Sequence, residues 1–221
     1  MNLDHLIANT HTGVKICGIT TAQQSHEVVA AGADALGFNF WPKSKRFLEP
    51  TAAAPWLHEL RGAVLRVGVF VNPDDATLRS VVEADLIDVV QLHGDETAER
   101  CLEVSQLGLP IIKAFQVKDE TTLGTLGQWT TQAWLLDSYN PGLYGGEGKS
   151  FPWHLAGLAK SLFTQVPIIL AGGLTPENVG RAVQDARPAA VDVASSVESA
   201  PGVKDLGKVR EFIARAREVV P

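Results

Sequence analysis

The sequence predicts an α/β protein, a single-domain (β/α)8 barrel of the TIM type, and three observations carry this prediction. Eight short apolar runs alternate with eight segments of helical pattern along the 221 residues. The apolar runs are rich in Val, Ile, Leu and Ala, which is typical of parallel strands buried on both faces. No segment reads as a linker, so we expect one domain. Eight repeats in a chain of this size favour a closed barrel over an open doubly wound sheet.

The chain is expected to consist of a short N-terminal extension and one barrel domain. Residues 1–12 are polar and short of hydrophobic pattern, so we expect a loose N-terminal extension, followed by a barrel domain over 13–221. Helix 121–128 is the weakest of the expected helices because its glycines and threonines are poor helix formers. The expected strands are 14–19, 35–40, 64–71, 88–92, 111–115, 134–137, 167–171 and 189–193. The expected helices lie, in chain order, near 20–31, over 51–60, from 73, over 96–107 and 121–128, from 153, from 175 and over 206–216.

Composition excludes several classes of partner. The net charge of −6 argues against nucleic-acid binding, which needs a basic face. No apolar run approaches the length of a membrane span, and the first residues lack the basic and apolar regions of a signal peptide. The two cysteines, Cys17 and Cys101, show neither a disulfide framework nor zinc-ligand spacing. We therefore expect a cytoplasmic protein that acts on a small molecule.

The first strand ends at Cys17, which is followed by a glycine and an expected helix. In a barrel the active site lies at the carboxyl ends of the strands. A helix N-terminus stabilises a thiolate and lowers the thiol pKa, which suits a general base. The alternative is a small buried hydrophobic residue, and we expect that role for Cys101.

Polar residues also close the other strands, at Asn39, His93, Lys113, Asp137 and Asp192. The alternative explanation is that strand ends are wetter than strand centres. Asp137 is either the cap of a turn or a general acid whose pKa is raised by desolvation. The glycine-rich stretch 142–148 after it has the composition of a mobile lid.

Two late loops predict a phosphate site. Gly172 and Gly173 follow the seventh strand, and Ala194, Ser195 and Ser196 follow the eighth. The loops after strands seven and eight form the phosphate site common in these barrels, since small residues let backbone N–H groups approach the anion. We expect a phosphorylated small molecule as the ligand.

Strand alternation predicts a buried charge. If Cys17 faces the barrel mouth, Lys15 lies two residues earlier on the same inward face. A buried lysine needs a partner. Strand eight neighbours strand one in a closed barrel, so we predict a Lys15–Asp192 ion pair. The alternative is a lysine that reaches water at the bottom of the barrel.

Eight segments together resemble the phosphoribosylanthranilate isomerase family of tryptophan biosynthesis. The resemblance spans nearly the whole chain after the first dozen residues, and the segments are specific as a set. They are KICGIT (15–20), GADALGF (32–38), PKSKR (42–46), VGVFVN (67–72), VQLHG (90–94), LLD (135–137), GGLTPENV (172–179) and VDV (191–193).

The resemblance implies a cofactor-free barrel that carries out an Amadori rearrangement. Asp137 then matches the acid that opens the ribose ring, and Cys17 matches the base that removes the C2′ proton. Arg46 matches the residue that engages the anthranilate ring and carboxylate, whereas by itself the 43–46 stretch reads as a solvated basic turn. His93 lies in a matching segment and is expected to bind substrate. The late loops match the phosphate grip.

The chain departs from the family pattern at three positions. Ser196 stands where glycine is usual, Pro152 where a carboxylate is usual, and Glu147 where a small residue is usual. Ser196 alters the turn or adds a hydroxyl to the phosphate site, and Pro152 removes a helix cap.

Other readings stay open. They are a sister barrel (indole-glycerol-phosphate synthase, or the ribonucleotide isomerase of histidine synthesis) and a non-catalytic phosphate-binding barrel. Cys17 counts against the histidine-pathway enzyme, whose base we expect to be a carboxylate. We expect a monomer, with a dimer as the alternative.

Overall fold

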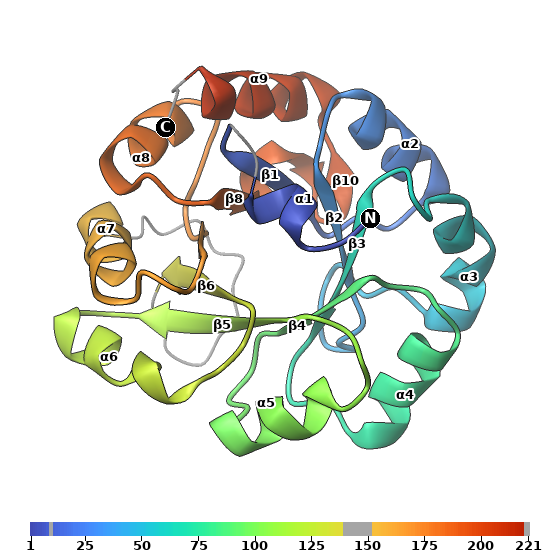
Figure 1. Ribbon diagram of the computed structural model, residues 1–221. Helices are drawn as coiled ribbons and strands as arrows, with labels where there is room; N and C mark the ends of the chain where they lie inside the picture. Colours follow the sequence, from blue (N-terminus) through green and yellow to red (C-terminus); the bar gives the residue numbers. More distant parts are fainter. Residues whose placement is uncertain (9–10, 139–151, 219–221) are drawn as a thin grey trace.

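Eight parallel strands form a closed barrel in chain order (Figure 1). The computed structural model describes residues 1–8, 11–138 and 152–218. β1 pairs with β8 as well as with β2, so the sheet closes and the open doubly wound alternative is wrong. The strands are β1 (Gly13–Cys17), β2 (Ala35–Asn39), β3 (Leu65–Phe70), β4 (Val89–Leu92), β5 (Ile111–Val117), β6 (Ala133–Ser138), β7 (Ile168–Leu170) and β8 (Ala190–Val193).

The helices form a ring around the strands (Figure 1). The segment 121–128, expected as one helix, is split into the short α6 and a 3-10 turn, η1, in keeping with its poor helix formers. The helices are α1 (Asp4–Ile7), α2 (Ala22–Ala30), α3 (Pro50–Glu59), α4 (Asp75–Glu83), α5 (Ala98–Ser105), α6 (Glu120–Gly124), η1 (Leu126–Gln128), α7 (Trp153–Leu162), α8 (Val179–Ala186), η2 (Ser195–Val197) and α9 (Leu206–Arg217).

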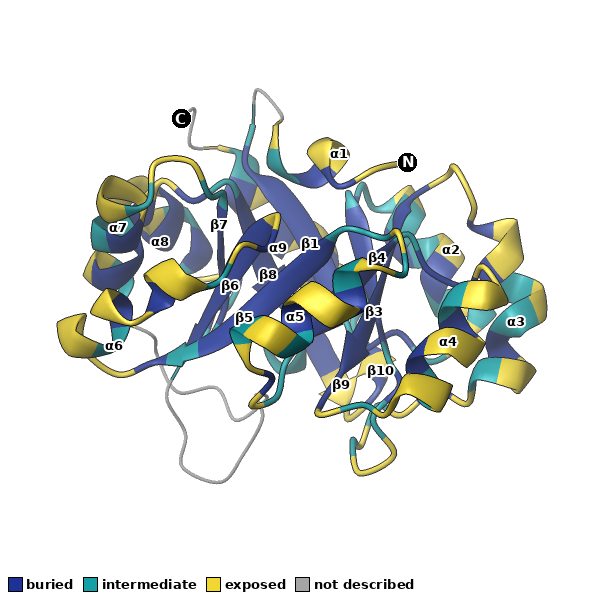
Figure 2. Cartoon of the chain, turned by 60° about the horizontal axis from the view of Figure 1, so that its bottom comes forward, coloured by how far each residue is buried: buried dark blue, intermediate teal, exposed yellow. Residues whose placement is uncertain are grey.

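A small antiparallel hairpin follows the barrel's last strand, and the sequence did not predict it. Its strands are β9 (Glu198–Ala200) and β10 (Val203–Lys204). Figure 2 shows β9 and β10 at one end of the barrel and α1 at the other. The hairpin therefore lies at the carboxyl ends of the barrel strands, where an active site is expected.

The N-terminal segment packs against the barrel. Leu3 and Leu6 are buried and belong to the cluster of small and branched side chains inside the barrel, with Ala35, Leu65 and Val67 among its members. Leu3 is the N-cap residue of α1 and Leu6 lies within the helix, so the two leucines are three residues apart and lie on one side of this turn. Residues 3–7 therefore cover the amino end of the barrel and are not loose. We retain 1–12 as an extension and 13–221 as the barrel domain as a proposed division.

Two helices begin later than the sequence predicted. α2 starts at Ala22, with Thr21 as its N-cap accepting a hydrogen bond from the backbone N–H of Gln24. α8 starts at Val179, after the turn that contains Thr175. Loops, and not helix N-termini, therefore follow both Cys17 and the 172–173 diglycine.

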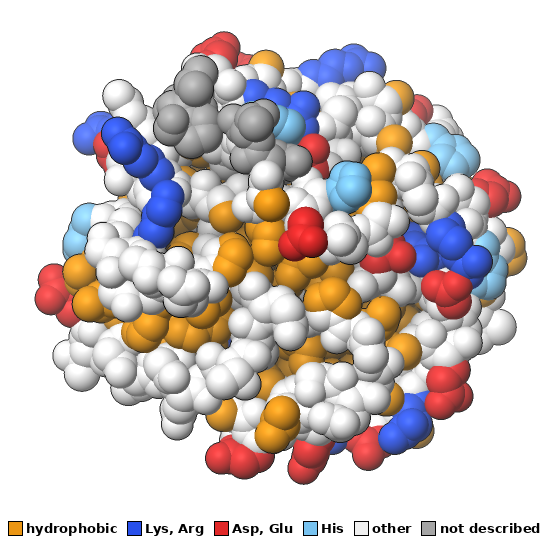
Figure 3. Space-filling model, viewed as in Figure 1, with side chains coloured by type: hydrophobic (Ala, Val, Ile, Leu, Met, Phe, Trp, Pro, Cys, Tyr) orange, Lys and Arg blue, Asp and Glu red, His pale blue; other side chains and the backbone are white. Residues whose placement is uncertain are grey.

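Surface character differs over the molecule. Seen from the side on which α1 lies, hydrophobic side chains gather over the middle of the face, and most charged side chains lie toward its edge (Figure 3). Within the described ranges, no helix combines the length and apolar character needed to cross a membrane.

Candidate active site

One pocket opens at the carboxyl ends of the strands, with a volume of about 290 Å³. The structure brings all nine of the site residues expected from the sequence to its wall: Cys17, Arg46, His93, Asp137, Gly172, Gly173, Ala194, Ser195 and Ser196. They come from the ends of β1, β4, β6, β7 and β8 and from the loop after β2. Closure of the barrel is what gathers residues that are far apart in the chain.

Cys17 ends β1 and is half-buried. It pairs in register with Gly37 of β2, and a Cβ built on Gly37 would lie 2.6 Å from the Cys17 Sγ and 2.9 Å from the Lys15 Nζ. The thiol and the ammonium group therefore share space that only a glycine leaves open. Gly18 has a positive φ of 82°, and a Cβ there would lie 2.3 Å from Cδ of Arg46. Because Gly18 has no side chain, the Arg46 side chain can pack against the backbone at the end of β1.

The electrostatic surroundings of Cys17 differ from the expectation. Burial raises the pKa of the Cys17 thiol, and the nearby Lys15 ammonium opposes this without cancelling it. No helix begins directly after Cys17, so the predicted lowering of the pKa by a helix N-terminus is wrong. Lys15 and Lys204 are the cations that favour the thiolate. Cys101 is buried on α5, and burial raises its pKa to about 11, which agrees with an inert core residue.

The predicted ion pair under the pocket is confirmed. Lys15 Nζ donates to Asp192 Oδ1 at 2.7 Å, and the two residues are register partners on β1 and β8. Burial alone would lower the pKa of Lys15, but the Asp192 carboxylate and Cys17 outweigh it and raise that pKa. Lys15 is fully buried, so the alternative of a lysine reaching water is wrong. The ammonium charge is therefore held directly beneath Cys17.

Asp137 lies on β6 with its carboxyl group buried at the pocket wall. Its Oδ1 accepts a hydrogen bond from the backbone N–H of Ser138 at 2.7 Å, and its Oδ2 lies 3.3 Å from Nε2 of His93. The side-chain amide nitrogen of Gln91 lies 2.9 Å from Nδ1 of His93. Among the described residues, Nε2 of His93 makes no hydrogen bond, so its approach to Asp137 is a contact between two polar groups at the pocket wall.

The loops after β7 and β8 form the wall expected to hold phosphate. Gly172 and Gly173 have positive φ values of 80° and 66°. The side chain of Asn178 organises the first loop, because its Oδ1 accepts from Thr175 N and its Nδ2 donates to Gly173 O. The Ser196 hydroxyl donates to Leu174 O. Ser196, which stands where glycine is usual, therefore links the loop after β8 to the loop after β7 by a hydrogen bond.

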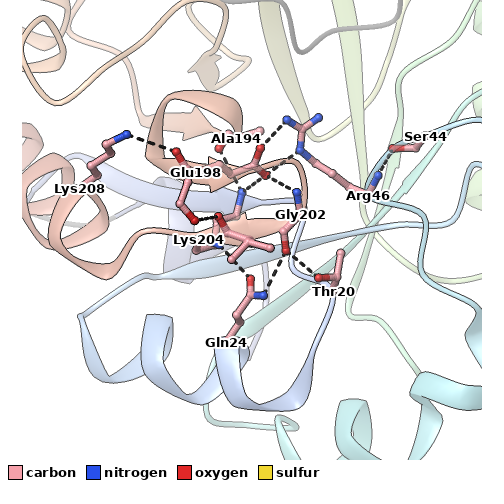
Figure 4. Close-up of polar contacts among 11 residues, drawn as sticks. Thr20, Gln24, Ser44, Arg46, Ala194, Glu198, Gly202, Lys204 and Lys208 are labelled. Atoms are coloured by element: carbon pink, nitrogen blue, oxygen red, sulfur yellow. Dashed lines mark hydrogen bonds and ion pairs between the residues drawn. The ribbon is translucent and has the colours of Figure 1, made fainter.

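Arg46 reaches the pocket from the loop after β2. Its Nε and Nη2 donate to the two carboxylate oxygens of Glu198, each at 2.7 Å, as Figure 4 shows. Glu198 in turn accepts from Lys204 Nζ at 2.8 Å. Lys43 and Lys45 line the same pocket, so the 43–46 turn, which by itself reads as a solvated basic turn, belongs to the site.

Sequence reasoning missed some residues and misplaced another. Glu198, Lys204 and Gly37 carry no local signal, because a charged residue in a late loop and a glycine in a strand are both common. Lys113 lies within β5 and pairs with Glu96 at 2.9 Å, so it does not line the pocket. Other lining residues that were not singled out as site residues are Asn39, Trp41, Ser44, Val69, Val71, Ser138, Ala171, Leu174, Thr175, Asp192 and Val193.

The positions around the expected lid are only partly described. The glycine-rich stretch 142–148 and Glu147 lie outside the described residues. Pro152 precedes α7, and no side chain caps that helix, as expected from the missing carboxylate. Among residues 1–8, 11–138 and 152–218, no group of three or more His, Cys, Asp or Glu is placed to hold a metal ion.

The closed barrel and a polar pocket at the carboxyl ends of its strands define the class: a (β/α)8-barrel enzyme. The model of the N-(5′-phosphoribosyl)anthranilate (PRA) isomerase family matches residues 14–215. The chain belongs to this family. The match decides against the sister barrels considered above.

Relatives and solved structures agree with this assignment. An N-(5′-phosphoribosyl)anthranilate isomerase of Geotalea uraniireducens is 47% identical over 206 residues, which cover 93% of this chain and 98% of the relative. A solved isomerase in complex with reduced 1-(o-carboxyphenylamino)-1-deoxyribulose 5-phosphate is 36% identical with a TM-score of 0.80, covering 94% of this chain and 100% of that one. A Thermotoga maritima structure holds mutually generated monomers of a dimeric member, also 36% identical with a TM-score of 0.80 and the same coverage.

Proposed function

We propose that this chain converts N-(5′-phosphoribosyl)anthranilate to 1-(2-carboxyphenylamino)-1-deoxyribulose 5-phosphate, an Amadori rearrangement of tryptophan biosynthesis. Membership of the isomerase family supports this activity. So does the relative that binds a reduced form of the product. The observation that carries the mechanism is that Cys17 and Asp137, from β1 and β6, line one pocket.

In this mechanism the acid and the base each move one proton, the final tautomerisation then transfers a proton from the C2′ hydroxyl to C1′, and no electrons leave the substrate. Asp137 donates a proton to the ribose ring oxygen, so the C1′–O bond breaks and a Schiff base forms. The Cys17 thiolate then removes the proton from C2′. The electron pair of the broken C2′–H bond forms the C1′–C2′ double bond and neutralises the iminium nitrogen, which gives an enolamine. The enolamine tautomerises to the ketone. General acid–base catalysis of this kind contributes about 10²- to 10⁴-fold per group.

The remaining residues of the pocket are assigned to binding. Arg46 is proposed to engage the anthranilate carboxylate, which suits a planar guanidinium. The backbone at Gly172 and Gly173 and at Ala194–Ser196 is proposed to hold the phosphate. His93, beside Asp137, is proposed to contact the sugar.

The test is steady-state turnover of Cys17→Ala and Asp137→Asn, with substrate binding measured separately. We expect each variant to bind substrate and to lose about 10²- to 10⁴-fold in kcat. Near-wild-type turnover by both variants would show that this acid–base pair is wrong. A wild-type chain that binds substrate but turns none over would identify a non-catalytic phosphate-binding barrel.

We also propose a cytoplasmic monomer, with a dimer as the alternative. Within the described part of the chain, the exposed large hydrophobic residues come from several elements, as Phe47, Leu102 and Leu162 illustrate, which favours a monomer. The Thermotoga maritima relative is described as dimeric, which makes the alternative specific. Size-exclusion chromatography with light scattering separates the two, since a dimer would elute at twice the chain's mass.

A further inference from the structure

Arg46 is held by a carboxylate of its own protein, and this contact leaves part of the guanidinium free. Its Nε and Nη2 donate to Glu198 Oε1 and Oε2, each at 2.7 Å, in a bidentate pair that fixes the plane of the group. Of the hydrogen bonds that Arg46 makes with the described residues, none uses Nη1 (Figure 4). One edge of the guanidinium is therefore anchored while another stays available at the pocket wall.

Glu198 is itself anchored by a second cation. Lys204 Nζ donates to Glu198 Oε1 at 2.8 Å, and the side chains of both residues are buried. Burial would raise the pKa of Glu198, but Arg46 and Lys204 outweigh it and lower that pKa. The carboxylate therefore keeps its charge at neutral pH, which a buried acid without partners would not do.

The same lysine reaches the expected phosphate loop. Lys204 Nζ also donates to the carbonyl of Ala194 at 3.1 Å. Figure 4 shows the resulting series of contacts, from Arg46 through Glu198 and Lys204 to Ala194. The β2 loop and the β8 loop, far apart in sequence, are thus joined by two ion pairs and one hydrogen bond.

The hairpin that carries these two residues is fixed to the barrel. The hydroxyl of Thr20 and the side-chain amide of Gln24 both donate to the Gly202 carbonyl, at 2.8 and 3.1 Å. Lys204 N donates to Oε1 of Gln24 at 3.3 Å. The hairpin therefore cannot shift without breaking contacts to the segment that follows Cys17, so it provides a rigid support.

We propose that Glu198 and Lys204 are positioning residues that fix the orientation of Arg46 and its distance from the phosphate loop. This inference rests on the proposed function, in which Arg46 takes the carboxylate of the substrate and the β8 loop takes its phosphate. The spacing between the two anion sites then sets the length of doubly anionic substrate that fits. A ligand with only one anionic end senses the orientation of Arg46 when it binds there, but it does not sense this spacing.

A purely structural role makes a different prediction, and the chain offers a matched control. Arg66 and Asp88 form a comparable pair, at 2.7 Å, at the amino end of the barrel, with the Arg66 side chain buried and that of Asp88 half-buried. Asp88→Asn and Glu198→Gln each remove one negative charge that is paired with an arginine and keep the shape of the side chain. If both acids serve only stability, both variants lose stability and neither changes substrate binding.

The experiment compares Glu198→Gln, Asp88→Asn and the wild-type chain. KM and kcat are measured with phosphoribosylanthranilate, and calorimetry gives the affinities for anthranilate and for inorganic phosphate. For Glu198→Gln we expect KM to rise about ten- to a hundredfold with kcat changed less than about threefold, because a charged hydrogen bond that binds ground and transition states alike is weakened. Anthranilate should bind more weakly, while phosphate affinity should stay within about twofold. Asp88→Asn should change none of these values.

The outcomes separate the inference from the proposed function. If the wild-type chain has no isomerase turnover, the proposed function is wrong, and the anthranilate affinity of Glu198→Gln still decides the positioning role. If the wild type turns over and Glu198→Gln keeps its KM and anthranilate affinity, the inference is overturned. Should Glu198→Gln fail to fold, Glu198→Asp keeps the charge with a shorter side chain, and we expect a smaller rise in KM. An unchanged KM in that variant overturns the inference equally.

Discussion

Two arginines at opposite ends of the barrel, Arg66 buried and Arg46 half-buried, use their hydrogen-bonding capacity differently. At the amino end, all three guanidinium nitrogens of Arg66 donate, to Asp85, to Asp88 and to the Leu57 carbonyl. At the carboxyl end, two guanidinium nitrogens of Arg46 donate to Glu198, and the third donates to no residue that the structure describes. Both are anchored by carboxylates of their own protein.

The difference shows how a barrel separates stability from function. A fully satisfied arginine can only hold structure, and breaking its pair leaves a buried charge without a partner. A partly satisfied arginine is held in place and still offers a donor to a ligand. Changes at the amino end should therefore affect unfolding alone, whereas changes at the carboxyl end should affect catalysis as well.

The largest expected effect comes from the Lys15–Asp192 pair. Lys15 lowers the Cys17 pKa and Asp192 raises it, so Lys15→Met should shift the pH profile of kcat/KM to higher pH and Asp192→Asn to lower pH. At pH 7 we expect Lys15→Met to lose roughly ten- to a hundredfold in kcat/KM. Each variant should also lose about 3–5 kcal/mol in the free energy of unfolding, measured with urea. Shifts in the same direction would contradict the assignment of Cys17 as the base.

The pH dependence of the thiol provides the next test. Burial raises the Cys17 pKa above its ordinary value, and only the thiolate accepts a proton. In the wild type Asp137 must also carry a proton, so that profile reports two groups. Asp137→Asn has no ionisable acid at this position, so its residual kcat/KM should increase about tenfold per pH unit as pH rises toward the Cys17 pKa. Asp137→Asn with Arg66→Met added, at the far end, should show the same profile. A profile of Asp137→Asn that is flat from pH 6 to 8 would exclude a thiol of raised pKa as the base.

A smaller effect is expected from Gly37→Ala. The added Cβ would lie 2.6 Å from the Cys17 Sγ, so the thiol or the strand must move. We expect a loss of about tenfold in kcat and about 1–3 kcal/mol of stability. The matched control is Gly124→Ala in α6, where a Cβ meets nothing within 4 Å. If Gly37→Ala keeps wild-type kcat, close packing around the thiol does not matter for turnover.

The smallest effect on catalysis is expected at the amino end. Arg66→Met should lower the free energy of unfolding by about 3–5 kcal/mol, since it leaves Asp88 without its cation. Its kcat and KM at 25 °C should match the wild type within about twofold, because Arg66 does not line the pocket. A change in kcat larger than tenfold would show that the two ends of the barrel are coupled.

The sequence determined the barrel because its signals are local and repeated. Eight apolar runs with intervening helical pattern require a parallel sheet, and polar residues such as Cys17 and Asp137 mark the strand ends. Alternation along β1, with the adjacency of β1 and β8, was sufficient to predict the Lys15–Asp192 pair, which the structure confirms. Each of these inferences uses only strand periodicity and chain order.

Tertiary structure alone decided how the site is charged and braced. The pKa of Cys17 depends on burial and on lysines of two strands, so the predicted helix effect gave the wrong direction. The bracing of Arg46 joins residues 152 positions apart, and no local pattern marks such a pair. The role of Leu3 and Leu6 as a cover for the barrel appears only once the barrel exists. Strand ends can be read from a sequence because each is a property of one segment, whereas contacts across the barrel mouth are a property of its closure.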